Sequence, residues 1–262
     1  MAVDLGYDEG GAGDTLLVST QIAITEQARK LKRHWKSALG EVEYFHSKDL
    51  ENFTHGVFTK AGLDATERQQ LLKKLGKIIH RHLTLGITAK ISKKLYDSMT
   101  TNEFRSRWGT AYTFAVNMCL LGAYLEFRMG DEKDFPWPAV DVNVLLEAGH
   151  RHCGQALQIL NEGNKVPLKK RFVTILSAGL GSKKDHPILQ AADMLAYTEW
   201  QDISSRLSPL YPVMYRFTSR YRTARVDCTA ELINEMNQGA FRWLEKRRQY
   251  WDTNRRHPVT AP

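Results

Sequence analysis

Three acidic residues lie beside or within apolar segments, and their carboxylates are the groups in this sequence best suited to chemistry. Asp8 follows the alternating apolar run 3–7, and Glu147 follows a second such run, 140–146. Asp193 lies inside an apolar, alanine-containing segment. An ionised carboxylate close to a protein core is costly unless it is paired or bound to a metal ion. We therefore expect acids from two strands and a late helix to meet at one end of a sheet.

Carboxylates gathered in this way are typical of sites for Mg²⁺ or Mn²⁺, because these cations prefer oxygen ligands. Two such ions, about 3.5–4 Å apart, can stabilise both the attacking water and the leaving oxygen in phosphodiester hydrolysis. We expect Asp8, Glu147 and Asp193 to be the core ligands. The neighbouring Glu9 is expected to be an additional ligand or a partner of one. Each acid also has a structural alternative, which is a solvated turn for the adjacent pair, a helix cap or salt bridge for Glu147 and a partner of a buried arginine for Asp193.

Histidine and basic side chains near these acids are candidates for positioning a phosphate. His46 follows an aromatic run and is expected either to act beside the metal ions, as a base or a phosphate contact, or to be a hydrogen-bonded structural residue. Arg151 starts a predicted helix after Glu147, where phosphate groups bind favourably. Lys183 and Lys184 precede the helix of Asp193, and a solvated loop is their alternative. Their glycine-containing loop lacks the spacing of a nucleotide-triphosphate loop.

The overall charge points to a polyanionic partner. The formal net charge is +8 and the pI is about 9.3, which favours nucleic acid first and an anionic membrane surface second. In the C-terminal part, basic residues alternate with aromatic ones, a pattern that suits contacts to a nucleic-acid backbone and stacking on bases. The alternative is a solvated helix face. The candidate contacts there, besides Arg151 and Lys184, are Arg220, Arg222, Arg242, Lys246 and Arg247.

Composition narrows the protein class. The chain has 262 residues, 42% of them hydrophobic, which is enough for a sizeable core. Its three cysteines form no closely spaced pair, so neither a disulfide scaffold nor a zinc site is expected. The first residues lack the features of a signal peptide, and the longest apolar run is too short and too polar for a membrane span. We expect a cytoplasmic protein that does not enter a membrane.

Periodicity predicts the elements that must hold these residues. Alternating apolar residues predict strands, and apolar residues three and four positions apart predict helices. The expected strands are a hairpin within 3–24 and the segments 42–46, 85–91, 140–146 and 171–176, followed by a loop at 177–186. The expected helices are 25–38, 64–83, 102–128, 151–160, 187–204 and 229–250. This order predicts an α/β protein with a mixed sheet flanked by helices. We expect one α/β domain, residues 1–208, with a helical insertion around 60–130. Residues 209–262 are expected to form a basic C-terminal helical extension packed on the same domain.

Two motifs resemble those of a known family, the domain of unknown function 3800 family. Its members typically open with a strand that ends in Asp-Glu-Ser-Gly, and here the sequence YDEGG occupies residues 7–11. They close the core with a helix that carries Gln-x-x-Asp-x-x-Ala, and here QAADMLA occupies residues 190–196. Further similar segments are FHSKDL at 45–50, GVF at 56–58, GIT at 86–88 and EAGH at 147–150. The resemblance covers the chain from about residue 3 to residue 204.

The resemblance implies a ribonuclease H-like fold and, by analogy, a metal-dependent nuclease that acts on RNA or DNA. One departure is Gly10, which stands where the family usually has serine. Two other functional classes stay open. One is a nucleic-acid-binding protein whose ribonuclease H-like site is catalytically silent. The other is a subunit, as a homo-oligomer or with a partner protein, of a defence or mobile-element system.

Overall fold

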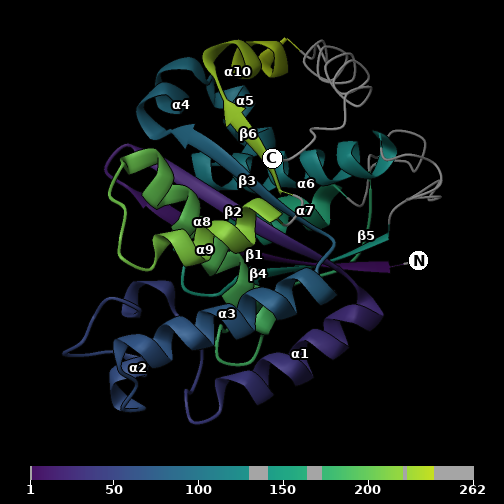
Figure 1. Ribbon diagram of the computed structural model, residues 1–262. Coiled ribbons are helices and arrows are strands. Elements are labelled where there is room, and N and C mark those ends of the chain that lie inside the picture. The colour runs from purple at the N-terminus through teal and green to yellow at the C-terminus, as the bar shows by residue number, and fades with distance from the viewer. Residues whose placement is uncertain (1, 130–140, 164–172, 221–222, 239–262) are drawn as a thin grey trace.

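A six-stranded mixed sheet with helices on both faces forms the centre of this α/β protein (Figure 1). The computed structural model describes residues 2–129, 141–163, 173–220 and 223–238. The strands are β1 (Ala2–Ala12), β2 (Thr15–Ile24), β3 (Leu85–Ser92), β4 (Asp141–Glu147), β5 (Thr174–Gly181) and β6 (Thr223–Cys228). They lie in the order β5-β4-β1-β2-β3-β6. The predicted α/β class, with a mixed sheet flanked by helices, is confirmed.

The strand directions place several carboxyl ends at one edge of the sheet. β1 and β2 form an antiparallel hairpin, and β2 also pairs antiparallel with β3. β4 runs parallel to β1, β5 runs parallel to β4, and β6 runs parallel to β3. The carboxyl ends of β1, β4 and β5 therefore meet, which is where open α/β sheets usually bind ligands.

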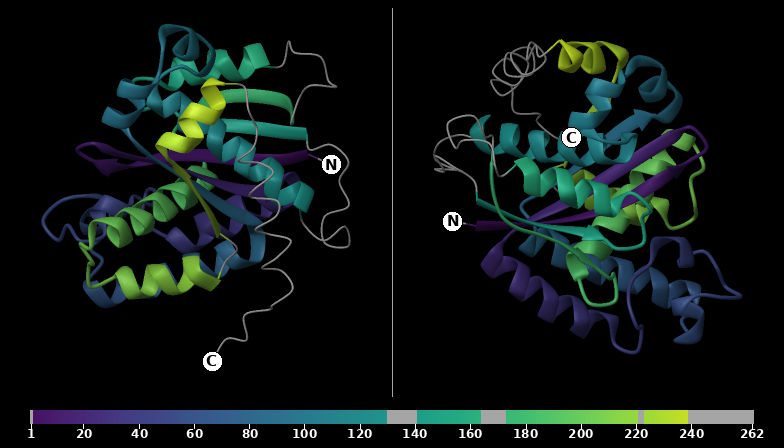
Figure 2. Two further views of the ribbon diagram at one scale, coloured as in Figure 1. Left: turned by 90° about the horizontal axis from the view of Figure 1, so that it is seen from above. Right: turned by 180° about the vertical axis from the view of Figure 1, so that it is seen from behind.

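The helices form a layer on each face of the sheet (Figure 2). They are α1 (Thr25–Leu39), the 3₁₀ turn η1 (Ser47–Asp49), α2 (Val57–Lys60), α3 (Ala65–His82), α4 (Lys93–Met99), α5 (Asn102–Trp108), α6 (Ala111–Met129), α7 (Cys153–Gly163), α8 (Pro187–Ser204), α9 (Tyr211–Arg220) and α10 (Ala230–Asn237). Among the described helices, none combines the length and the apolar character that a membrane span requires.

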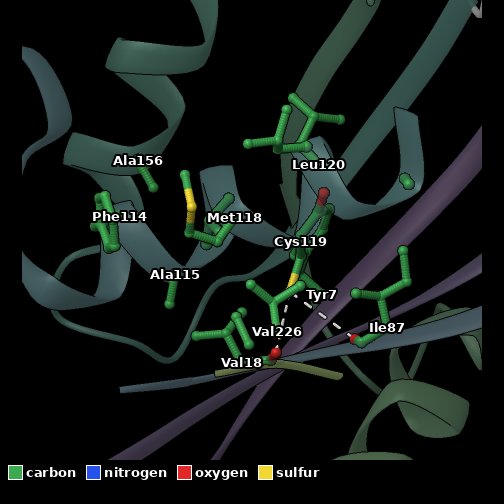
Figure 3. Packing of buried hydrophobic residues seen from close by; sticks show 14 of the residues in the cluster. Tyr7, Val18, Ile87, Phe114, Ala115, Met118, Cys119, Leu120, Ala156 and Val226 are labelled. Atoms are coloured by element: carbon green, nitrogen blue, oxygen red, sulfur yellow. Dashed lines mark hydrogen bonds between the residues drawn. The ribbon is translucent and has the colours of Figure 1, made fainter. Parts of the chain in front are cut away.

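One layer consists of α4, α5, α6, α7 and α10, which share a core with the sheet. Helix α6 crosses β2 and β3, and Cys119 of this helix lies among buried side chains from the strands (Figure 3). Its Sγ donates a hydrogen bond to the carbonyl oxygen of Val18, 3.1 Å away. Burial raises the pKa of the Cys119 thiol, so this cysteine is a packing residue.

The other layer is built around α8, which packs directly on β1 and β2. Helices α1 and α9 each pack on α8, and α3 packs on both α1 and α9. Their apolar faces share a second core with residues such as Trp35, Leu75 and Met194. The start of α3 is fixed by a capping box, in which Asp64 and Glu67 bond each other's backbone N–H groups.

Four local predictions differ from the structure. Residues 42–46 are not a strand, and the backbone N–H of Phe45 donates to the Gln190 side chain of α8. The predicted helix 102–128 is two helices, since Gly109 ends α5 with a φ of 75° that favours glycine. β5 extends through the first half of the segment predicted as a loop. The edge strand β6 was not predicted, because only Val226 and Cys228 in it are buried.

Candidate functional site

The three predicted acids converge on one cation at the carboxyl edge of the sheet. The Nζ atom of Lys183 lies 3.0 Å from Oδ2 of Asp8 and 2.9 Å from Oδ1 of Asp193. It lies 3.3 Å from Oε1 of Glu147. We call these four residues the Lys183 cluster. The Asp8 side chain is fully buried, whereas that of Glu147 is 24% exposed, so the cluster opens to solvent on the Glu147 side.

Strand register brings the first two acids together. Tyr7 of β1 pairs with Leu146 of the parallel strand β4. The residues that follow them, Asp8 and Glu147, therefore lie side by side. Lys183 enters from the loop after β5, which is the next parallel strand. The cluster is thus assembled by three adjacent parallel strands and by α8, which supplies Asp193.

Two glycines let α8 come close enough to β1 to complete the cluster. A Cβ atom on Gly6 would lie 2.7 Å from Cγ2 of Ile188, and one on Gly10 would lie 3.3 Å from Cβ of Ala196. Asp8 lies between these glycines on the same face of the strand, because side chains two positions apart point the same way. The glycines therefore allow α8 to pack over Asp8, and this packing places Asp193 beside Asp8.

Helix α8 also holds the segment that carries His46. Oδ2 of Asp193 accepts a 2.6 Å hydrogen bond from the backbone N–H of Ser47. One turn earlier, Oε1 of Gln190 accepts hydrogen bonds from the backbone N–H of Phe45, at 2.7 Å, and from Nε1 of Trp35, at 2.8 Å. The same Gln190 side chain donates to the carbonyl oxygen of Lys183 at 2.6 Å. The motif Gln-x-x-Asp thus ties α8 to both loops at the site.

A buried arginine fixes the loop that follows His46. The guanidinium group of Arg68, on α3, donates to the backbone carbonyl oxygens of Asp49, Leu50, Asn52 and Leu63. It also donates to the hydroxyl of Thr59. Because backbone carbonyls in a loop lack partners of their own, this one side chain substitutes for secondary structure. Arg68 therefore supports the loop that places Ser47 against Asp193.

The charges within the cluster shift its pKa values in opposite directions. Burial, and then the negative charge of Asp193, raise the pKa of Asp8 well above its usual value. Burial alone would raise the pKa of Asp193 too, but the Lys183 ammonium and hydrogen bonds outweigh it and lower that pKa. Burial opposes the charge on Lys183, yet Asp193, Asp8 and Glu147 raise its pKa overall. The pair of aspartates therefore holds a proton more readily than two separate carboxylates would.

A cavity of about 860 Å³ leads from solvent to the cluster. Asp8, Glu147 and Asp193 lie in it together with Lys183. Basic and histidine side chains contributed by loops and helices also line it: His46, Lys48, Lys93, Arg105, His150, Arg151 and His152. Glu9 and Asp97 line the walls as well, so basic and acidic side chains alternate above the acids of the floor.

Glu9 does not join the cluster. Its neighbour Asp8 points to the α8 side, and side chains next to each other on a strand point to opposite faces. Oε2 of Glu9 lies 2.7 Å from Nε2 of His150. The His150 ring stacks on Tyr112, with ring centroids 3.8 Å apart. Glu9 therefore lines the cavity as the partner of a histidine.

Of the other predicted site residues, some line the cavity and others lie outside it. His46 lines the cavity, with Nδ1 lying 3.4 Å from Oδ2 of Asp49. Arg151 also lines the cavity and donates from Nε to His152. Lys184 points away from the cluster and pairs with Glu43 at 2.7 Å. Arg220 is the last residue of α9. Arg222, Arg242, Lys246 and Arg247 lie outside the described residues.

The cluster has the donor chemistry of a divalent-cation site but is arranged around an ammonium group. Among the described residues, no group of three or more His, Cys, Asp or Glu side chains has the arrangement of a metal site. The carboxylates are at ion-pair distances from Lys183, whereas Mg²⁺ ligands lie at about 2.0–2.1 Å. Oδ1 of Asp8 is buried without a hydrogen-bond partner among the described residues, whereas Oδ2 faces the Lys183 ammonium. Three convergent carboxylates, one of them with a free buried oxygen, have the donor chemistry that a hard cation prefers.

Comparison with known proteins adds no further information about the site. No model of a known protein family matches the sequence, and no curated protein matches it either. The resemblance to the domain of unknown function 3800 family therefore stays a prediction from motifs. The function has to be argued from the geometry of the site.

Several residues that shape the site were not predicted to do so. Gln190 belongs to a motif that the sequence analysis singled out, but its three hydrogen-bond partners come from distant segments. Gly6 gave a weak signal, as a glycine inside an alternating strand pattern marks close backbone approach. Arg68 gave none, because a lone arginine in an amphipathic helix is usually exposed.

Proposed function

We propose that this protein is a Mg²⁺- or Mn²⁺-dependent nuclease that hydrolyses phosphodiester bonds. The observation that carries the proposal is the convergence of Asp8, Glu147 and Asp193 on one cation at the floor of a cavity lined in part by basic side chains. Phosphodiester hydrolysis needs positive charge close to the scissile phosphate and an activated water. Three convergent acids beneath a cavity that also carries basic side chains can supply both requirements.

The arrangement of the elements also supports the proposal. We propose that the fold is the ribonuclease H-like one that the sequence resemblance implies. Its support is the central antiparallel hairpin β1–β2, the parallel strand β4 beside it, and the acid-bearing helix α8 on the same strands. Fold by itself does not determine function, so this likeness adds to the argument from the cluster and does not replace it.

The residues of the cluster have distinct roles in this proposal. Asp8, Glu147 and Asp193 would hold the divalent cation, and the Ser47 N–H keeps Asp193 in place. When bound, Mg²⁺ or Mn²⁺ supplies positive charge at a phosphate and lowers the pKa of water. Because like charges repel, the Lys183 ammonium has to leave the point where the carboxylates meet when a cation binds there. Lys183 then presents its charge to the phosphate from the cavity floor.

The side chains of the cavity walls would bind the nucleic acid without taking part in the hydrolysis. Lys48, Lys93, Arg105 and Arg151 come from four separate segments and bring cations to the cavity walls. His46 also lines the cavity, and the residue after it, Ser47, donates its backbone N–H to Asp193. Its place beside the cluster suits a phosphate contact.

A second candidate function is nucleic-acid binding by a catalytically silent site, alone or as a subunit of a larger complex. Lys183 favours it, because an ammonium that pairs with all three acids already offsets part of their charge. In that case the cluster would be a structural unit that closes the end of the sheet.

Cleavage of end-labelled RNA and DNA, single- and double-stranded, with Mg²⁺, Mn²⁺ or EDTA distinguishes the two functions. The wild type is compared with Asp193→Asn and with Asp185→Asn, which removes the same charge from an exposed residue of the neighbouring loop. We expect metal-dependent cleavage by the wild type and by Asp185→Asn, and a loss of at least about a hundredfold in Asp193→Asn. Nucleic-acid binding without cleavage in any metal would reject the nuclease and favour the silent site.

A further inference from the structure

Two neighbouring helices outside the Lys183 cluster carry a positive excess as large as that of the whole sequence. α1 and α3 together contain ten Lys and Arg residues and two acids, which is an excess of eight. The formal net charge of the whole sequence is +8, so the rest of the chain is balanced. Of the two acids, Glu26 pairs with Lys30, and Glu67 belongs to the capping box of α3.

Eight of these ten cations are exposed, whereas Arg68 is buried. α3 ends where β2 ends, since Thr84 donates to the carbonyl oxygen of Ile22, and α1 starts there. They therefore run antiparallel, and they pack against each other along the outside of the α8 layer (Figure 1). The exposed cations are Arg29, Lys32, Arg33, Lys36, Lys73, Lys74, Lys77 and Arg81. We call them the α1–α3 surface.

The charges are close enough to act on one another. His34 and His82, one from each helix, lie in contact, with ring nitrogens 2.7 Å apart. Burial lowers the pKa of His82, and the positive charges of His34, Arg81, Lys30 and Arg33 lower it further. Pairs such as Lys32 and Lys36, or Lys73 and Lys77, lie one helical turn apart. Like charges at this spacing destabilise a helix, so the pattern costs stability unless something anionic binds.

We propose that the α1–α3 surface binds the phosphate backbone of double-stranded nucleic acid. Its cations match a row of phosphates, and the apolar side chains of both helices, such as Leu31, Leu39 and Ile79, are turned inward. The exposed side chains between the cations are polar, for example Ser37 and Gln70. The surface therefore offers a membrane nothing apolar to insert.

The same face distinguishes a duplex from a single strand. Proteins that bind single strands stack bases on exposed aromatic side chains. The tryptophan of these helices, Trp35, is fully buried, and α1 and α3 carry no Phe or Tyr. Contacts to phosphates alone suit a duplex, whose bases are already stacked on one another.

The α1–α3 surface and the cavity are connected by a short stretch of sequence. The segment that leaves α1 at Gly40 reaches the cavity at His46. Tyr44, between them, lies under the ammonium of Lys184. The short segment 40–46 therefore joins the C-terminal end of α1 to the wall of the cavity. The binding stands on the charges alone, whereas its use in cleavage rests on the proposed function.

Binding is measured by fluorescence anisotropy of labelled DNA duplex, RNA duplex and the matching single strands, in EDTA, over a series of salt concentrations. The test variant is Lys36→Gln with Lys77→Gln. The matched control is Lys94→Gln with Arg107→Gln, which removes the same charge from exposed residues of α4 and α5 on the opposite layer (Figure 1). Glutamine and lysine have similar helix propensities, so both proteins are expected to fold.

We expect duplex to bind more tightly than single strands. The test variant should lose on the order of tenfold in affinity, and the slope of log affinity against log salt should fall by about two. The control should keep the wild-type slope, and Lys36→Arg with Lys77→Arg should retain tight binding. An unchanged slope in the test variant would overturn the proposal. So would binding to vesicles of anionic lipid in place of duplex.

This experiment separates the two proposals. Loss of duplex binding in the test variant, without cleavage by the wild type in any metal, supports the α1–α3 surface and rejects the nuclease. Metal-dependent cleavage combined with unchanged binding by the test variant supports the nuclease and rejects the surface.

Discussion

The side-chain amide of Gln190 donates a 2.6 Å hydrogen bond to the carbonyl oxygen of Lys183. The acceptor atom of the same side chain holds Phe45, which directly precedes His46. One residue of α8 therefore fixes the two loops that bring Lys183 and Ser47 to Asp193. This arrangement makes Gln190 a positioning residue for the cluster.

Replacing Gln190 by glutamate should lower both the stability of the protein and the affinity of the cluster for Mn²⁺. The carboxylate can still accept from Phe45 and Trp35, but it cannot donate to Lys183 and faces its carbonyl oxygen instead. We expect a loss of about 1–3 kcal/mol in the free energy of unfolding. We also expect at least tenfold weaker Mn²⁺ binding by isothermal titration calorimetry, which is about 1.4 kcal/mol. Trp35→Phe removes only the indole donor, so it should lower stability and leave Mn²⁺ affinity intact. Equal effects of both variants on Mn²⁺ affinity would contradict this role.

Removing the ammonium of Lys183 should change metal affinity and metal-free stability in opposite directions. Lys183→Met leaves three acids without their shared cation, so thermal unfolding in EDTA should show a loss on the order of 3 kcal/mol. Without the competing charge, Mn²⁺ should bind on the order of tenfold more tightly. Lys184→Met is the control, since its ammonium pairs with the exposed Glu43 outside the cluster. Weaker Mn²⁺ binding by Lys183→Met would show that Lys183 does not stand in the cation's place.

The raised pKa of Asp8 should appear as pH-dependent stability in the metal-free protein. Burial, and then the charge of Asp193, raise the pKa of Asp8 in the folded state. Over the range between the unfolded value, about 3.9, and the raised value, the folded protein binds more protons, so its stability falls as pH rises. Asp8→Asn cannot titrate and should lose this slope. The measurement is urea unfolding of both proteins in EDTA across that range. Parallel pH profiles would argue against the raised pKa.

The approach of α8 to β1 should be intolerant of a single methyl group. Gly6→Ala would place its Cβ 2.7 Å from Cγ2 of Ile188 and 3.0 Å from its carbonyl carbon, so the helix would have to move. We expect a loss of about 1–3 kcal/mol by chemical denaturation. Gly154→Ala, where nothing lies within 4 Å of the new Cβ, should be neutral or gain about 0.5–1 kcal/mol from helix propensity. A stable Gly6→Ala protein with intact Mn²⁺ binding would mean that the close packing is not needed for the cluster.

Much of the framework could be predicted from the sequence because it depends on local patterns. Alternating apolar residues identified β1, β2 and β4, and apolar spacing identified α3 and α8 with nearly their observed ends. Glu147 is the last residue of β4, as the sequence predicts. Asp8 was predicted to end the first strand, but it lies inside β1, which continues to Ala12 because the hairpin with β2 pairs residues 9–12 as well. The predictions failed where distant segments decide the local structure. Residues 42–46 do not form a strand, and the N–H of Phe45 bonds Gln190 of α8. β6 forms a strand by pairing with β3, which is distant in the sequence.

The tertiary structure alone decided which groups meet. Asp8 and Glu9 are adjacent in sequence, yet Asp8 faces α8 and Lys183 while Glu9 pairs with His150. Lys183 was one of several basic candidates, and only the parallel register of β4 and β5 with the docking of α8 placed its ammonium among three acids. The composition gives the net charge of +8, whereas the antiparallel packing of α1 and α3 brings the exposed cations of these two helices together. Residue types and spacing determine the chemistry that each segment can supply. Contacts between segments depend on register and packing distance, which no single segment encodes.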